Sequence, residues 1–199
     1  MFASKKEIVK AANIIKKGGI VAYPTETVYG LGALLEEDTI KKVFNLKKRP
    51  LNNPISLAVS SIDMIEKVAY VDSKSKNFID QFLPGPVTIL LKKKTSLPNI
   101  LTASSEIVGI RYPNHEIALK LIELTGPITS TSANLSGESP PTSMEEINLP
   151  CYILYGVCEY KIPSTIVDLV NWKILRKGAG YEKIKKGFLS NIYHRQTIR

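Results

Sequence analysis

The order of apolar and polar residues predicts a chain in which helices and strands alternate. Ser4 and Glu7 have the spacing of a capping box, and apolar residues recur with helical spacing after them, so a helix is expected over 5–17. Short apolar runs such as Ile20 to Tyr23 predict strands instead. The same signals predict helices over 38–48, 61–67, 73–83, 114–124 and 180–190, and strands over 20–23, 55–59, 87–91, 107–111, 128–130, 152–155, 165–170 and 172–176. This interleaving is typical of the α/β class.

The bulk composition is that of one ordinary globular domain. The chain has 199 residues, of which 44% are hydrophobic and 23% are charged. No apolar run approaches the ~20 residues of a membrane span. The N-terminus lacks the pattern of a signal peptide. We therefore expect a cytoplasmic protein that makes no membrane contact, with one domain over 1–190 and a basic tail over 191–199.

Charge and cysteine content narrow the class of ligand. The net charge of +9 favours anionic partners, either nucleic acid or phosphate-bearing ligands, although a solvated, lysine-rich surface explains it equally well. Cys151 and Cys158 match no zinc or redox spacing, and no Cys/His cluster accompanies the two histidines. The sequence therefore predicts no metal-ligating residues.

Two loops rich in hydroxyl groups follow predicted strands. The first hydroxyl loop, residues 24–32, reads PTETVYGLG between an apolar strand and a helix, where main-chain N–H groups and side-chain oxygens can meet a small polar ligand. The second hydroxyl loop, residues 130–137, reads STSANLSG and has five hydroxyl or amide side chains within seven residues. Threonine and glycine also serve structural turns, but the repetition of one design favours a small-molecule site.

Three cations end predicted elements near these loops. Lys47 and Arg49 close a helix that Pro50 stops, where they either meet phosphates or only complement the helix dipole. Arg111 follows an apolar strand and needs an anionic partner, which is either a ligand or a structural carboxylate. The chain has no phosphate-loop, kinase or nucleophile-elbow motif, and neither histidine lies in a hydroxyl-rich loop. An enzyme built from these residues would work by positioning and cationic stabilisation rather than by a Ser–His nucleophile.

Six segments, in this order, make the chain resemble the YrdC-like family of L-threonylcarbamoyladenylate synthases. They are PTETVYGLG at 24–32, KKRP at 47–50, GIRYP at 109–113, STSANLSG at 130–137, PSTIVD at 163–168 and ILRKGA at 174–179. The resemblance runs from about residue 8 to residue 190. It implies the single-domain form of the enzyme, with a twisted, open mixed sheet flanked by helices and a basic concave face.

The reaction implied by this resemblance joins L-threonine, bicarbonate and ATP into L-threonylcarbamoyl-AMP and releases pyrophosphate, which makes the enzyme a nucleotidyltransferase. The product serves the threonylcarbamoyl modification of the adenosine at position 37 of tRNA. Direct contact with tRNA, or with a downstream transfer complex, is therefore a possible further partnership. ATP is a substrate here, and Mg²⁺ is expected with it, held largely by phosphates and water.

The resemblance also implies roles for individual residues. The cations expected to face ATP or the carbamate as catalytic groups are Lys47, Arg49 and Arg111. The residues expected to bind the threonine substrate are Thr25, Thr27, Tyr29 and Ser164. The residues expected to bind the nucleotide are Lys47, Arg49, Ser132, Asn134 and Arg176, and of these Arg176 is expected to close over the site together with Ser164.

One position departs from the family pattern, and two other functions stay open. Many members have a histidine where Ala58 follows PISL, so any role of that histidine would fall to another residue. A non-catalytic RNA-binding module that uses the basic concave surface is one alternative, although aromatic residues make up only 8% of the chain and no RRM-type sequence occurs. A related enzyme that uses carbamoyl phosphate and ATP, as in hydrogenase-maturation proteins, is the other. It would normally carry acylphosphatase and zinc-finger segments, which this sequence lacks.

Overall fold

The computed structural model describes residues 3–193. Within this range the helices are α1 (Lys5–Lys16), α2 (Glu37–Leu46), α3 (Ile62–Val68), α4 (Ser73–Phe82), α5 (Glu116–Thr125) and α6 (Tyr181–Tyr193), with short 3-10 helices η1 (Asn99–Thr102) and η2 (Met144–Glu146). The strands are β1 (Val21–Tyr23), β2 (Gly30–Gly32), β3 (Ser56–Ala58), β4 (Val87–Lys92), β5 (Ile107–Arg111), β6 (Ile128–Ser132), β7 (Tyr152–Ile153), β8 (Thr165–Asp168) and β9 (Lys173–Arg176). None of the helices in this range is long and apolar enough to cross a membrane.

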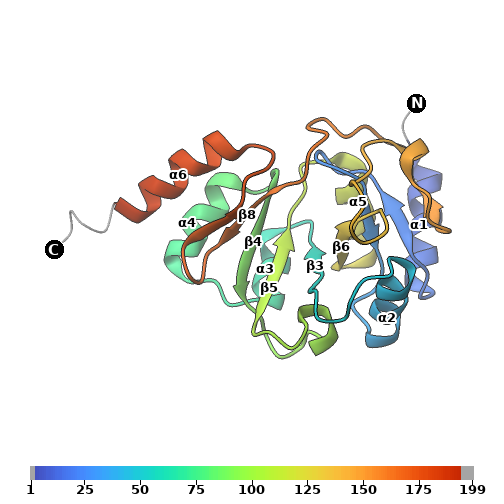
Figure 1. Ribbon diagram of the computed structural model, residues 1–199, viewed down its shortest axis with the longest axis horizontal. Helices are drawn as coiled ribbons and strands as arrows, with labels where there is room; N and C mark the ends of the chain where they lie inside the picture. Colours follow the sequence, from blue (N-terminus) through green and yellow to red (C-terminus); the bar gives the residue numbers. More distant parts are fainter. Residues whose placement is uncertain (1–2, 194–199) are drawn as a thin grey trace.

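These strands form one mixed sheet in the order β7-β1-β2-β6-β3-β5-β4-β8-β9 (Figure 1). The pairs β1–β7, β3–β5 and β4–β8 are parallel, and the other neighbours are antiparallel. Strand β6 lies between β2 and β3, and Leu31 pairs with Thr131, so the two hydroxyl loops are brought side by side. The predicted α/β class and mixed sheet are therefore confirmed.

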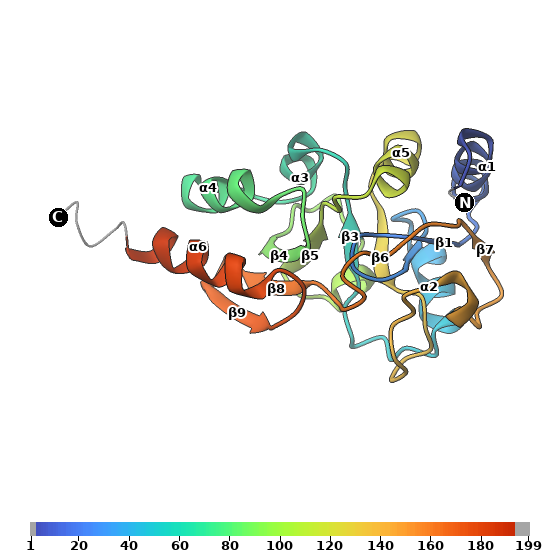
Figure 2. The ribbon, with the colours of Figure 1, turned by 90° about the horizontal axis from the view of Figure 1, so that it is seen from above.

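Apolar residues that alternate along the central strands build the main core. Ile89 of β4 and the pair Val108 and Ile110 of β5 are buried in one cluster with Phe78 and Ile79 of α4. Figure 2 shows α1, α3, α4 and α5 in a row along this side of the sheet. Each such side chain contributes about 1.5–3 kcal/mol by leaving water. Because successive residues of a strand point to opposite faces, the residues between these positions are presented on the other side of the sheet.

A second cluster fixes the end of the sheet that carries β1. Ile8 and Ile15 of α1 and Leu121 of α5 are buried together with Val21 of β1 and Ile128 of β6. This packing holds α1 against α5 and anchors the strands that lead into the two hydroxyl loops.

Local signals set several helix ends. Ser4 and Glu7 form the predicted capping box, in which Glu7 N donates to Ser4 Oγ (3.3 Å) and Ser4 N donates to Glu7 Oε2 (2.7 Å). The N-cap of α5 is His115 rather than the predicted Asn114, and its side chain makes no capping hydrogen bond. The main-chain geometry, rather than the better capping residue, therefore sets where α5 begins.

Several elements differ from the sequence prediction; β7 and β8, for example, each end two residues earlier than predicted, and β2, β6 and α6 differ as follows. Strand β2 lies within the first hydroxyl loop, where two glycines give little β-propensity; it forms because Gly30 and Leu31 pair with β1 on one side and β6 on the other. A Cβ on Gly32 would lie 2.8 Å from the side chain of Ile128, so this position has no room for one. Strand β6 continues to Ser132, two residues further than predicted. Helix α6 continues to Tyr193, so 191–193 are helical rather than part of a loose tail, and 194–199 of that predicted tail lie outside the described residues.

Candidate active site

The structure has a cavity of about 510 Å³, a volume typical of small-ligand sites. Its lining residues on the central strands alternate with those of the main core, so it lies on the opposite face of the sheet from α4. Strands β3 to β6 and β8 and the first hydroxyl loop contribute to its lining. Eight of the ten residues expected from the sequence to form the site line this cavity: Thr25, Thr27, Tyr29, Arg49, Arg111, Ser132, Ser164 and Arg176. The other two, Lys47 and Asn134, are not among its lining residues.

Small and hydroxylated residues of the central strands form the floor of the cavity. Ser56 of β3, Thr88 of β4 and Ser130 of β6 line it, together with Gly109 of β5. A Cβ on Gly109 would lie 2.4 Å from Ser56 Oγ, so glycine at this position keeps the floor open. Sequence reasoning missed Ser56 and Thr88 as site residues. The single hydroxyl residue within each of these otherwise apolar runs is the signal that could have identified them.

The turn at the start of the first hydroxyl loop is organised by Thr25. Its Oγ1 donates to Val28 O (2.7 Å) and accepts from Thr27 N (3.2 Å), and it lies 2.9 Å from Thr27 Oγ1. Both threonines are buried and both line the cavity. This local hydrogen bonding fixes the backbone so that two hydroxyl-bearing residues are presented together at the cavity wall.

Tyr29 lines the cavity with its hydroxyl group already engaged. The Tyr29 hydroxyl donates to Gly156 O (2.8 Å) and accepts from Gly156 N (3.0 Å). Burial raises the pKa of this hydroxyl to about 12, so it stays protonated at neutral pH. Tyr29 therefore joins the first hydroxyl loop to the segment around residue 156, and its hydroxyl is already occupied by these two hydrogen bonds.

Arg49 enters the cavity from the segment that follows α2. Its Nε donates to Asn53 O (3.0 Å) and one Nη to Pro54 O (2.9 Å), so the turn before β3 holds the guanidinium in place. The side chain is half-buried, and burial lowers the pKa of Arg49, although an arginine stays charged at physiological pH. The segment after α2 thus supplies a fixed positive charge whose remaining N–H groups can donate to a ligand.

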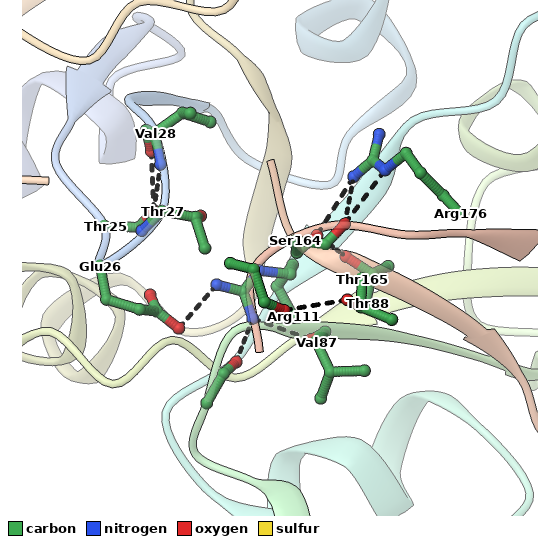
Figure 3. A network of polar contacts seen from close by, with 12 residues as sticks. Thr25, Glu26, Thr27, Val28, Val87, Thr88, Arg111, Ser164, Thr165 and Arg176 are labelled. Atoms are coloured by element: carbon green, nitrogen blue, oxygen red, sulfur yellow. Dashed lines mark hydrogen bonds and ion pairs between the residues drawn. The ribbon is translucent and has the colours of Figure 1, made fainter. Parts of the chain in front are cut away.

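Arg111 forms a buried ion pair with Glu26, a residue that sequence reasoning did not single out. Arg111 Nη2 lies 2.9 Å from Glu26 Oε1, and the other terminal nitrogen donates to Val87 O (2.8 Å) and Gly85 O. Figure 3 shows the guanidinium between the loop that carries Glu26 and strand β4. Arg111 thus has the structural carboxylate that was one of the two expected partners. It also lines the cavity, so its contact with a ligand stays a prediction. The partners are 85 positions apart in the sequence, which explains why no sequence signal revealed the pair.

A second network holds Ser164 at the opposite wall (Figure 3). Its hydroxyl lies 2.7 Å from Thr88 Oγ1, on the strand next to Arg111. Arg176 of β9 donates through Nε and Nη2 to Ser164 O (3.0 and 2.9 Å) and through Nη2 to Ser164 Oγ (3.2 Å). The exposed Arg176 side chain therefore lies over Ser164 at the edge of the cavity.

Lys47 is placed differently from its predicted position facing ATP. It is only 1% exposed, and its ammonium group donates to Asn134 O (2.6 Å) and to Ser132 O. Its own carbonyl accepts from Ser136 N (2.8 Å). Burial, followed by the nearby charge of Arg49, lowers the pKa of Lys47 to about 8. In this structure Lys47 supports the second hydroxyl loop from behind.

Asn134 and Ala58 also lie away from the lining. The Asn134 side chain donates to Leu135 O (2.7 Å) and Glu138 O (2.8 Å) and so closes the second hydroxyl loop rather than facing a nucleotide. Ala58, where many family members have histidine, is fully buried in the cluster around Ile128. The side chain at position 58 is therefore directed into this cluster and away from the cavity.

The charges around the cavity favour an anionic ligand. Among the described residues that line it are three arginines, and none is aspartate or glutamate. Within residues 3–193 there is also no group of three or more histidine, cysteine, aspartate or glutamate side chains that could hold a metal ion. Fixed guanidinium groups and clustered hydroxyls are suited to orienting phosphates and carboxylates and to stabilising charge that develops on them.

The fold and this arrangement of residues agree with a known protein family. Residues 13–178 match the Sua5/YciO/YrdC family, described as telomere recombination. The chain belongs to this family. The resemblance inferred from the six sequence segments is thereby confirmed.

Relatives within the Sua5/YciO/YrdC family agree in sequence and in structure. A threonylcarbamoyl-AMP synthase of Pyrococcus abyssi is 39% identical over 188 residues, which cover 88% of this chain and 55% of that protein. A Methanocaldococcus jannaschii protein is 39% identical over 194 residues, which cover 92% of this chain and 92% of that protein. The crystal structure of P. abyssi Sua5 complexed with L-threonine superimposes with a TM-score of 0.87 at 38% identity, covering 92% of this chain and 57% of that one. The chain thus spans about half the length of the P. abyssi relative.

Proposed function

We propose that this protein is a nucleotidyltransferase that makes L-threonylcarbamoyl-AMP from L-threonine, bicarbonate and ATP and releases pyrophosphate. The observation that carries the proposal is the cavity itself, in which three arginines and many hydroxyl groups converge without a lining carboxylate. The names of the relatives support the same activity, and one related structure contains L-threonine. The threonylcarbamoyl group would then pass to the adenosine at position 37 of tRNA through a downstream complex.

The proposed reaction has two bond-forming steps. The amine of threonine attacks carbon dioxide, which is supplied by bicarbonate with loss of water, and gives a carbamate. A carbamate oxygen then attacks the α-phosphorus of ATP, and the bond to the departing pyrophosphate breaks. The carbamate is unstable in water, so the site has to exclude water and hold the two reactants in line.

The residues divide naturally between the two substrates. Arg49 and Arg176 would face the phosphates, because both are fixed at the cavity and neither has a carboxylate partner within residues 3–193. Thr25 and Thr27 would receive the amino acid beside Ser164, and Ser132 would contact the nucleotide. Lys47 and Asn134 contribute indirectly, by shaping the second hydroxyl loop. Mg²⁺ would arrive with ATP and be held by phosphates and water, since the lining offers no carboxylate.

The cavity favours this reaction over the RNA-binding alternative. Hydroxyl groups at the base of a cavity suit a small ligand, whereas single-stranded RNA is usually held by exposed aromatic platforms. The net charge of +9 is compatible with an additional contact to tRNA.

Pyrophosphate release tests the proposed function directly. The purified protein should release pyrophosphate when L-threonine, bicarbonate and Mg-ATP are all present, and omission of any one should abolish the signal. A panel of amino acids, with serine and valine as the nearest analogues, should show preference for threonine, which also tests the consequence of Ala58. Failure of a folded protein to release pyrophosphate in the complete mixture would refute the proposal.

A further inference from the structure

Glu26 is a buried carboxylate next to the cavity that does not itself line it. Its side chain is 3% exposed, whereas its neighbours Thr25 and Thr27 both belong to the lining. In Figure 3 the Glu26 side chain extends from the first hydroxyl loop toward the guanidinium of Arg111. The carboxylate of Glu26 can therefore influence a ligand in the cavity through Arg111, which does line it.

The hydrogen bonds of Arg111 leave part of its guanidinium free for a ligand. Of its five N–H donors, both on Nη1 are used by Gly85 O and Val87 O, and one on Nη2 is used by Glu26 Oε1. Within residues 3–193, the Nε–H group and the second Nη2–H group form no hydrogen bond. Since Arg111 lines the cavity, these two donors can receive an oxyanion such as a carboxylate, a carbamate or a phosphate.

The cost of this ion pair indicates that it serves more than stability. Glu26 Oε2 is buried and has no hydrogen-bond partner among the described residues. Apolar residues of similar volume often stabilise a protein as well as a buried ion pair does, and an unsatisfied buried oxygen adds a further penalty. An arginine that two carbonyls and one carboxylate hold from one side is, however, fixed in a single orientation.

The main chain of Glu26 is also fixed, so its carboxylate can hold Arg111 in a constant position. Its carbonyl accepts from Tyr160 N (2.8 Å), which ties the first hydroxyl loop to the segment that precedes Ser164. The hydrogen bonds of Thr25 fix the turn on either side of it. The carboxylate is thus carried by a backbone that two segments hold in place.

We propose that Glu26 is a positioning residue, which orients Arg111 so that its two free donors face the reacting oxyanion. This inference rests on the proposed function for its kinetic readout. It requires that the carboxylate act through Arg111 and not through the general stability of the fold.

A double-mutant cycle on pyrophosphate release tests this coupling. Glu26→Gln removes the charge but keeps the shape of the side chain, and kcat/KM should fall about 100-fold, the scale of a misplacement of a reactive group by roughly 1 Å. In an Arg111→Lys background, which keeps the charge but loses the planar fork, the same substitution should change kcat/KM by less than about threefold.

Asp168 provides a matched control for the loss of a buried carboxylate. It is 5% exposed at the end of β8, accepts from Val170 N and Asn171 N (2.9 Å each), and does not line the cavity. Asp168→Asn should lower the melting temperature but leave kcat/KM within about threefold of the wild type.

The outcomes separate this inference from the proposed function. Wild-type protein that releases no pyrophosphate refutes the function itself. Active wild-type protein refutes only the role of Glu26 if Glu26→Gln behaves like Asp168→Asn, or if Glu26→Gln lowers kcat/KM equally in both backgrounds. Should Glu26→Gln fail to fold, Glu26→Asp replaces it in the same cycle. This variant keeps the charge on a side chain one methylene shorter, and a loss of about tenfold that disappears in the Arg111→Lys background is then expected.

Discussion

Replacing Lys47 by methionine removes the ammonium group behind the second hydroxyl loop while keeping most of the side-chain volume. A pKa near 8, against 10.5 for a free lysine side chain, means that burial disfavours this charge by about 3 kcal/mol. The hydrogen bonds of Nζ to Ser132 O and Asn134 O return about 1.5–3 kcal/mol each. Because the neutral amine also has two N–H groups to donate, these bonds form in both protonation states and do not restore the pKa. The two contributions largely cancel. Lys47→Met should therefore lower the free energy of unfolding by no more than about 2 kcal/mol, or roughly 4–8 °C in Tm.

The effect of Lys47→Met on activity should be much larger than its effect on stability. Without the ammonium group, the carbonyls of Ser132 and Asn134 lose the donor that draws them away from the cavity, and the Ser132 side chain at the lining is free to move. We expect kcat/KM for pyrophosphate release to fall about 100-fold. The assay compares this value with the melting temperature of the same preparation.

Lys42→Met is the control for this experiment, because Lys42 lies on α2 and its ammonium group donates to Gly18 O (3.2 Å), away from the cavity. It should leave kcat/KM unchanged. Lys47→Met protein that keeps kcat/KM within about threefold of the wild type would show that the loop needs no support from Lys47. A loss of Tm well beyond the expected range would show that the balance between burial and hydrogen bonding was misjudged.

Three further predictions concern pH, charge and space. The pKa of Lys47 is lowered from 10.5 to about 8 in the folded protein. Between these two pH values Lys47 is protonated in the unfolded state but largely neutral in the folded state. The free energy of unfolding therefore rises with pH across this window. Urea titrations at pH 8 and pH 10 should show this rise, about 2–3 kcal/mol, in the wild type but not in Lys47→Met. Arg49→Ala should reduce pyrophosphate release about 100-fold, and an unchanged rate would remove Arg49 from the site. Gly109→Ala should raise the KM for substrate about tenfold, because the added Cβ would lie 2.4 Å from Ser56 Oγ and push that side chain into the cavity. Combining it with Ser56→Gly should reverse much of this effect. Steady-state kinetics of the single and double variants test both expectations.

The sequence predicts the elements and most of the cavity because those depend on local signals. The capping box of Ser4 and Glu7 marks the start of α1 correctly, and the ends of β5 match the predicted strand. The two hydroxyl loops are recognisable because their polar residues are consecutive, and strand order alone then brings them together. Arg49 and Arg111 are found for a similar reason, since a cation at the end of an apolar element needs a partner or water.

The remaining features depend on the side to which a side chain turns, and on contacts between distant segments. Lys47 and Arg49 are two residues apart, yet one lies behind the second hydroxyl loop and the other lines the cavity. Spacing in a helix end and the turn after it does not decide between these two directions. The pair of Glu26 and Arg111 joins segments 85 residues apart, and only the assembled sheet brings them into contact. Strand β2 likewise forms because of its neighbours rather than because of its own composition.

In each central strand one face borders the cavity and the other packs against the helices, and this has a consequence for how substrate preference can change. Ser56, Thr88 and Gly109 touch the ligand space, while the residues beside them, such as Ile89 and Ile110, hold the helices. Substitutions at the cavity-facing positions of these strands, in natural divergence or by design, can therefore change substrate preference while the residues that pack against the helices stay the same.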